Sequence, residues 1–197
     1  MEDQLGILYL NTKKWYHDTN KGNDDDNTDR AHFQDRNTVM QLMKLYGKQR
    51  NVNEARKLHS EMKKLIPKQD IYIGTALLSM LAKCGALNEA REIFENLPYR
   101  NIVSWNALIA GYAQYGHFDA SLECLKHMRN EGISPDSVTF KCLVKGCAST
   151  GSLEIGEEIH AEVKKLDLLE KDIGLGTTLV DMYAKCGALG RAQELFE

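Results

Sequence analysis

The chain has 197 residues, of which 43% are hydrophobic, so it is long and apolar enough to form one ordinary domain with a core. It contains no apolar run near the roughly 20 residues that a membrane-spanning helix requires. Its formal net charge of −3 differs from the strongly basic balance of a general nucleic-acid-binding protein.

The chain begins with an acidic segment, residues 1–35, that we interpret as a head and linker without repeats. It holds eight acidic and four basic residues, whereas residues 36–197 are almost balanced, with 20 acidic and 21 basic. Apolar residues such as Leu5 and Trp15 fit a short capping helix, and residues 21–29 are typical of a flexible acidic linker. With one arginine and no serine, the segment lacks the composition of an organelle transit peptide.

From residue 36 onward the chain divides without a gap into five similar repeats. The clearest likeness is between residues 80–87 and 182–189, which share the run Ala-Lys-Cys-Gly-Ala-Leu. Internal repeats of about 20–50 residues indicate supersecondary units that stack on one another. The predicted repeats are residues 36–70, 71–101, 102–136, 137–172 and a truncated 173–197.

Four positions agree across the five repeats. The seventh position is always leucine, the seventeenth is always apolar, and the twelfth and twentieth are always small. In the third repeat, Trp105, Leu108 and Tyr112 have the spacing of one helix face, and a second helical pattern begins at Phe118. Gly116 lies between the two patterns, where a left-handed residue can end one helix before the next begins.

Each repeat is therefore predicted to be a pair of helices. Glycine occupies the turn in four of the repeats, whereas the first repeat has Arg50 there. Because one pair cannot bury its own apolar face, the pairs are expected to stack into an all-α solenoid, a superhelix of helix-turn-helix repeats. The fifth repeat stops at Glu197, inside its second helix, so we interpret the chain as a fragment or truncated member of a longer array.

The repeat lengths and motifs resemble the pentatricopeptide repeat family. Tetratricopeptide repeats keep a period of about 34 residues, whereas the four whole repeats here have 35, 31, 35 and 36 residues. The runs at residues 102–114, 133–136 and 181–187 carry the likeness, and the alternating lengths are similar to the land-plant PLS-type subclass. By that resemblance, repeats 71–101 and 173–197 are short-type, 102–136 is standard, and 36–70 and 137–172 are long-type.

The resemblance implies sequence-specific binding of single-stranded RNA, with one base read per repeat by a few side chains. In this family the fifth and the last residue of a repeat read the edge of the base. Thr75 with Asn101 resembles an adenine-reading pair, and Asn106 with Asp136 resembles a uracil-preferring pair. Thr177 suggests a purine. The long-type repeats depart from the code and are assigned no base; their pairs are Met40 with Asp70 and Lys141 with Asp172.

Two further columns have an expected role by the same resemblance. The second residue of a repeat stacks between bases, and Tyr72, Val103 and Val138 suit this role because every base has a face to cover. Asn37 and Gly174 suit it poorly. One column near the end of the first helix is expected to contact phosphate, and its lysines are Lys48, Lys83 and Lys185.

Structural alternatives remain open for these residues. Asn106 and Thr75 also fit an ordinary helix cap or a solvated polar position. Asp136 and Asn101 also fit helix-entry residues of the next repeat, and both roles can hold together. The lysine column equally fits a plain solvated face. At the level of function, the alternatives are a protein-interaction scaffold of the tetratricopeptide sort and an inert truncated array.

Catalysis is the least favoured function, because no nucleophile, acid and base arrangement stands out. Five cysteines without a CxxC pair favour a reducing compartment, and no cofactor, metal, membrane or small-molecule substrate is expected. The zinc deaminase signature, HxE followed later by PCxxC, is absent. By the resemblance, some longer relatives carry such a domain and convert cytidine to uridine in organelle transcripts. This chain is then expected to supply the address for RNA editing, with editing-complex proteins supplying the deaminase, in a mitochondrion or chloroplast or, alternatively, the cytosol.

Overall fold

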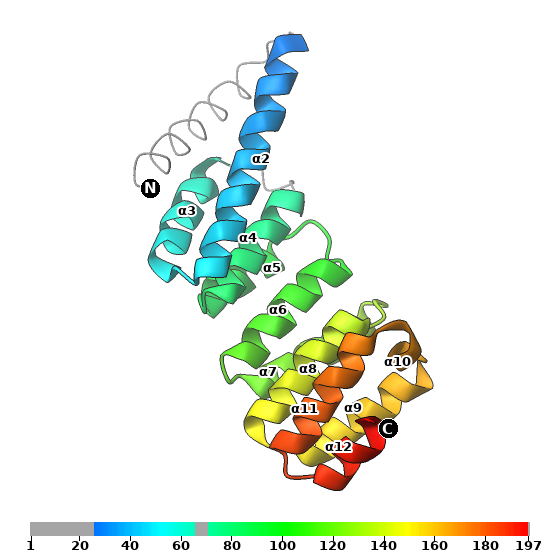
Figure 1. Ribbon diagram of the computed structural model, residues 1–197. Coiled ribbons are helices and arrows are strands. Elements are labelled where there is room, and N and C mark those ends of the chain that lie inside the picture. Colours follow the sequence, from blue (N-terminus) through cyan, green and yellow to red (C-terminus); the bar gives the residue numbers. More distant parts are fainter. Residues whose placement is uncertain (1–25, 66–70, 197) are drawn as a thin grey trace. The chain divides into compact units, whose positions relative to one another are not determined.

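The computed structural model describes residues 26–65 and 71–196, and within these the side chains of residues 37–63 and 71–195. The described residues form α-helices joined by turns and short loops, without strands (Figure 1). The chain divides into two compact units, Met1–Pro98 and Tyr99–Glu197, which we call the N-terminal unit and the C-terminal unit.

The N-terminal unit holds two stacked helix pairs. Helix α2 (Asp26–Gln49) pairs with α3 (Val52–Leu65), and α4 (Ile71–Lys83) pairs with α5 (Leu87–Glu95). Helix α4 also packs against both α2 and α3, which joins the two pairs (Figure 1). The core between them is apolar, with buried side chains that include Val39, Met43, Leu58, Met62, Ile73, Leu78 and Leu81.

Helix α2 begins earlier than the repeat pattern does. Its first residue is Asp26, so residues 26–29, the last part of the predicted acidic linker, are helical instead. The capping helix predicted around Leu5 and Trp15 lies outside the described residues, as does Asp70 at the end of the first predicted repeat.

The C-terminal unit by itself also consists of stacked helix pairs. Its helices are α6 (Ile102–Gln114), α7 (Phe118–Asn130), α8 (Ser137–Thr150), α9 (Leu153–Lys165), α10 (Leu168–Lys171), α11 (Ile173–Lys185) and α12 (Leu189–Phe196). Helix α8 packs against both α6 and α11, so the first helices of successive pairs lie side by side (Figure 1). The short α10 contacts α9 and α11.

Close packing depends on the columns that the sequence keeps apolar or small. The leucine of the seventh position is buried in every repeat, from 5% exposed at Leu42 to fully buried at Leu143 and Leu179. At the twentieth position, a Cβ added to Gly156 would lie 2.6 Å from Sδ of Met182, closer than real side chains approach. The small column therefore lets the second helix of one pair approach the first helix of the next.

The turn inside each pair uses a left-handed residue even where glycine is absent. Gly116 has φ +81°, and the other turn glycines lie close to this value. Arg50 occupies the same column and also takes a positive φ, 52°. The first repeat is therefore exceptional in residue type and not in backbone conformation, and a non-glycine residue in this conformation costs about 1–2 kcal/mol.

Candidate nucleic-acid interface

Helices α6 and α8 begin with the same reciprocal cap. Oδ1 of Asn101 accepts a hydrogen bond from the backbone N–H of Ser104 at 3.0 Å, and Ser104 Oγ accepts one from the backbone N–H of Asn101. Asp136 and Thr139 form the equivalent pair of bonds, at 2.9 and 3.1 Å. The last residue of a repeat is thus the N-cap of the next first helix, and such caps stabilise a helix by about 1 kcal/mol.

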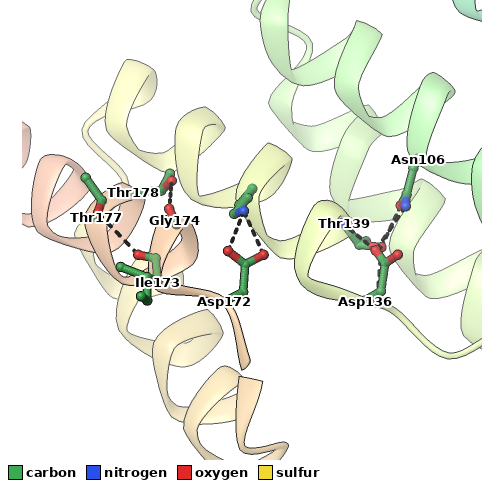
Figure 2. A network of polar contacts seen from close by, with 9 residues as sticks. Asn106, Asp136, Thr139, Asp172, Ile173, Gly174, Thr177 and Thr178 are labelled. Atoms are coloured by element: carbon green, nitrogen blue, oxygen red, sulfur yellow. Dashed lines mark hydrogen bonds and ion pairs between the residues drawn. The ribbon is translucent and has the colours of Figure 1, made fainter. Parts of the chain in front are cut away.

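Asn106, on α6, forms hydrogen bonds with both residues of the α8 cap. Its Nδ2 donates to Oδ1 of Asp136 at 3.0 Å, and the Thr139 hydroxyl donates to its Oδ1 at 2.6 Å. Figure 2 shows the three side chains facing one another. Thr139 is fully buried and Asn106 is 9% exposed, so the network holds the amide and the carboxylate in a fixed relation.

Asp136 is a carboxylate acceptor at neutral pH. Partial burial by itself raises the pKa of this group, but hydrogen bonds from the Thr139 backbone and from the Asn106 and Thr139 side chains outweigh burial and hold the pKa below its ordinary value. The described bonds from Asn106 and Thr139 all reach Oδ1. Oδ2 receives none of these three bonds, and a hydrogen bond from the Val138 backbone also helps to lower the pKa of the carboxyl group.

The next repeat places a different pair in the same register. Nζ of Lys141 donates to both oxygens of Asp172, each at 2.7 Å, and the two side chains are 28% and 25% exposed. The hydrogen bond from Lys141 is the largest cause that holds the pKa of Asp172 below its ordinary value. Sequence reasoning missed this ion pair, although opposite charges at the fifth and last positions were a visible signal.

The remaining predicted reading residues lie in separate settings. Thr75 is on α4 in the N-terminal unit, and its Oγ1 is buried without a hydrogen-bond partner among the described residues. Asn101, its predicted partner, caps α6 in the C-terminal unit. Thr177 on α11 donates to the backbone oxygen of Ile173 at 3.2 Å and is exposed. Met40 on α2 is half-buried.

The predicted stacking residues are exposed in spite of their apolar character. Tyr72 is 70% exposed, Val103 is 58% exposed and Val138 is 51% exposed, each one residue after the start of a first helix. At the same position, Gly174 adjoins Ile173, which is 86% exposed and was not selected from the sequence. Apolar side chains are thus exposed at one repeated register, outside the core.

The lysine column is solvent-exposed at the ends of α2, α4 and α11. Lys48 and Lys83 are exposed, and Lys185 donates to Oδ2 of Asp181 at 2.7 Å, one helical turn earlier. This pairing partly neutralises the Lys185 charge. Lys185 is therefore less available to a phosphate than an unpaired ammonium would be, and its phosphate role stays a prediction.

Other reactive groups are occupied with packing. Burial raises the pKa of the Cys147 thiol to about 12, and burial also raises the pKa of Cys84. Within the described residues, no group of three or more His, Cys, Asp or Glu side chains is placed to hold a metal ion. None of the helices in the described part of the chain is long and apolar enough to cross a membrane.

Comparison with sequence profiles gives repeated matches along the chain. A profile described as PPR repeat matches residues 38–65, 75–102, 138–168 and 177–197. A second, described as PPR repeat family, matches residues 100–149. The matched segments together cover more than half of the chain.

Several curated relatives come from Arabidopsis thaliana. One pentatricopeptide repeat-containing protein is 37% identical over 75% of this chain and 21% of its own length. A mitochondrial one is 38% identical over 82% of this chain and 16% of its own length. A chloroplastic one is 34% identical over 76% and 24%. The chain thus spans about a fifth of the length of these relatives.

Solved structures share the fold. The maize pentatricopeptide repeat protein PPR10 matches with a TM-score of 0.59 and 24% identity, over 86% of this chain and 27% of that chain. PPR10 in complex with an 18-nt psaJ RNA element matches with 0.61 and 20% identity, over 81% and 24%. The PPR domain of Arabidopsis protein-only RNase P 1 in complex with tRNA matches with 0.57 and 16% identity, over 80% and 88%. The predicted all-α solenoid fold is confirmed.

Proposed function

The chain belongs to the pentatricopeptide repeat family, and we propose that it binds single-stranded RNA, with one base facing each repeat. The observation that carries the proposal is the network of Asn106, Asp136 and Thr139 between exposed Val103 and Val138. It holds an amide and a carboxylate at a junction that has an apolar side chain in register on either side. The RNA-bound structures of similar proteins support the same function.

The chemistry of this junction suits uracil. The Watson–Crick edge of uracil presents an N–H donor beside a carbonyl acceptor. Asp136 supplies a carboxylate oxygen, Oδ2, that accepts from the base, and the second amide hydrogen of Asn106 donates to the carbonyl. Cytosine presents a ring nitrogen acceptor in place of the N–H, which a carboxylate repels. Guanine also presents an N–H donor beside a carbonyl, so the resemblance to the family's uracil-preferring pair decides between the two, and we assign uracil to repeat 102–136.

The flanking residues hold the base by its faces. Val103 and Val138 are exposed at the second positions of consecutive repeats, so a base that meets Asn106 and Asp136 lies between them. Stacking on an aromatic side chain is worth about 1–3 kcal/mol per base, and valine covers less area. Tyr72 is the strongest stacking residue by this reasoning. Thr177 is proposed to read a purine.

The wider role rests on the family and on the relatives. We propose that the repeats are those predicted from the sequence, that they form a PLS-type array, and that the chain acts in a mitochondrion or chloroplast, as the names of two similar proteins state for those proteins. Within that setting it supplies the address for C-to-U RNA editing and contributes no catalytic group. The deaminase is then provided by another part or partner of the editing complex.

Fluorescence anisotropy with short single-stranded RNAs tests the proposal, with only the base that faces repeat 102–136 varied. Wild-type protein is expected to favour uracil. The double variant Asn106→Thr, Asp136→Asn repeats the Thr75 and Asn101 pair, so its preference is expected to move towards adenine.

Asp119→Asn makes the same carboxylate-to-amide change on the exposed start of α7 and serves as the matched control. It should keep the wild-type preference. If wild type and variants are folded but none binds RNA, the RNA function is wrong for this chain, and the scaffold or inert-array interpretation replaces it.

A further inference from the structure

Thr139 is the third residue of repeat 137–172, and its hydroxyl reaches back to Asn106 in the preceding repeat. The hydroxyl donates to Oδ1 of Asn106 at 2.6 Å, and it also lies 3.0 Å from Oδ1 of Asp136. A hydroxyl group has one hydrogen to donate. Oδ1 of Asp136 already accepts from the Thr139 backbone N–H and from Asn106. The hydroxyl hydrogen therefore serves the shorter bond, to Asn106.

The orientation of the Asn106 amide follows from its two partners. An ionised carboxylate only accepts hydrogen bonds, so Asp136 has to face the amide nitrogen. The amide oxygen then faces the hydroxyl of Thr139, whose side chain is fully buried. Figure 2 shows Asn106 directed at both residues. Asn106 thus turns its one acceptor into the protein, and the second hydrogen of its amide nitrogen is the group left for a base.

An amide held in this way can donate to a base but cannot accept from it. Uracil presents a carbonyl oxygen at the place on its edge where cytosine presents an amino group. The carbonyl of uracil accepts from the amide nitrogen of Asn106, whereas the amino group of cytosine meets a second donor. The hydroxyl of Thr139 therefore bears on which base the amide favours, although it is too deeply buried to touch the base.

The following junction of the C-terminal unit offers a natural contrast. The third residue of repeat 173–197 is Leu175, which is fully buried and has no hydroxyl. There Asp172 makes no side-chain cap to α11, and its partner is the ammonium of Lys141. Of these two junctions, the one with an amide at the fifth position is also the one with a hydroxyl at the third position of the next repeat.

We propose that Thr139 is a positioning residue for base reading, which holds the amide oxygen of Asn106 and so favours uracil over cytosine opposite repeat 102–136. The proposal rests on the RNA-binding function proposed above. It makes the base preference of one repeat depend on a buried residue in the first helix of the next. Two repeats that carry the same fifth and last residues would then differ in their discrimination when the third residue that follows them differs.

Fluorescence anisotropy with the full chain tests the proposal, using two short single-stranded RNAs that differ only in uracil or cytosine opposite repeat 102–136. The measured quantity is the ratio of the two affinities, and wild-type protein is expected to favour uracil by roughly fivefold or more. Thr139→Val keeps the shape of the side chain and frees the Asn106 oxygen to turn towards the base. The ratio should then fall by roughly fivefold, the lower end of one base contact.

Two further variants separate the bond to Asn106 from the loss of a helix cap. Thr139→Ser keeps the hydroxyl and should keep the wild-type ratio. Ser104→Ala removes the equivalent cap hydroxyl of α6, which donates to the backbone oxygen of Asn101 and not to a reading side chain. It should weaken both affinities alike, if at all, and leave the ratio unchanged. A fall in the ratio as large as that of Thr139→Val would overturn the proposal.

The variant Asn106→Ala shows whether Thr139 acts through the amide. When Thr139→Val is added to Asn106→Ala, the ratio should not change further, because the amide oxygen that Thr139 holds is already gone. An equal fall with and without Asn106 would show that Thr139 changes the preference by another route, and the positioning role would be wrong.

The outcomes distinguish this proposal from the function on which it rests. An unchanged ratio in folded Thr139→Val overturns the role of Thr139 and leaves RNA binding and uracil reading intact. Wild-type protein that binds both RNAs equally rejects uracil reading, and the role of Thr139 with it. Loss of all RNA binding in folded wild-type protein rejects the RNA function itself. Far-ultraviolet circular dichroism establishes that each variant is folded.

Discussion

Two consecutive junctions of the C-terminal unit hold a last-position carboxylate with different chemistry. Asp136 is fixed by the helix that it caps, through Thr139, and receives a further bond from Asn106. Asp172 makes no side-chain cap to α11 and is held by Lys141 on α8. The bonds from Asn106 and Thr139 to Asp136 all reach one carboxylate oxygen, whereas Lys141 bonds to both carboxylate oxygens of Asp172.

Removing the packing beneath both junctions has the largest expected effect. Leu143 is fully buried on α8, the helix that carries Thr139 and Lys141. Leu143→Ala should lower the free energy of unfolding by about 2–5 kcal/mol, since it leaves a cavity. Urea denaturation followed by circular dichroism measures this. Leu166→Ala, at a 42% exposed position, is the control and should change stability by about 0.5 kcal/mol or less. Equal effects would contradict the buried role of Leu143.

Breaking the uracil junction alone should have a smaller effect. Thr139→Val keeps the shape of the side chain but leaves Asn106 Oδ1 and the backbone N–H of Asp136 without their partner. The expected loss is about 1–3 kcal/mol of unfolding free energy, because both groups are at least partly buried. Thr178→Val removes an exposed hydroxyl that donates to the backbone oxygen of Gly174, and serves as the control. Equal losses in the two valine variants would show that burial of the network is unimportant.

Acid should weaken both carboxylate junctions with the same sign. The pKa of Asp136 in the folded protein is below its ordinary value of 3.8, so its contribution to stability is present above that pH and is lost as the pH falls through the folded-state pKa. The difference in melting temperature between wild type and Asp136→Asn should therefore shrink below pH 3.8. Asp172→Asn should follow the same course. A difference that stays constant from pH 6 to pH 2 would be inconsistent with a lowered pKa.

Salt should affect the stability of the two junctions differently, and this is the smallest of the expected effects. The Lys141 and Asp172 side chains are partly exposed, so their attraction is screened when the Debye length falls to about 3 Å near 1 M salt. A small decrease in melting temperature for Lys141→Met at low salt should then vanish. The decrease for Thr139→Val should persist, because its network includes neutral hydrogen bonds. A salt-independent effect of Lys141→Met would mean that packing of its aliphatic stem, and not the ion pair, is what matters.

Most of the fold followed from local patterns. Helices α4, α6, α8 and α11 begin at the first residue of a predicted repeat. The start of α2 at Asp26 was not predicted, because the residues between Asp26 and the first repeat at residue 36 are mostly polar and lack the apolar spacing of the repeats. The left-handed conformation of Arg50 was also missed, since the residue type gives no sign of it and the closure of α2 on α3 requires it.

The candidate site was only partly predictable. Asn106 and Asp136 were selected by register, but register did not reveal that Thr139 joins them, nor that Asn106 is almost buried. Lys141 and Asp172 stood at the same two positions with opposite charges and were assigned no base. The structure brings them into contact, and it also shows that Gly174 leaves the space which that contact needs.

The sequence by itself determined most of the helix pairs and their glycine turns, because these depend on residues within one helix or one turn. The tertiary structure alone decided which polar groups meet. Asn106 and Asp136 are 30 residues apart, and Lys141 and Asp172 are 31 apart. Such partners come together only when first helices of neighbouring repeats pack side by side, so which polar groups meet is a property of stacking.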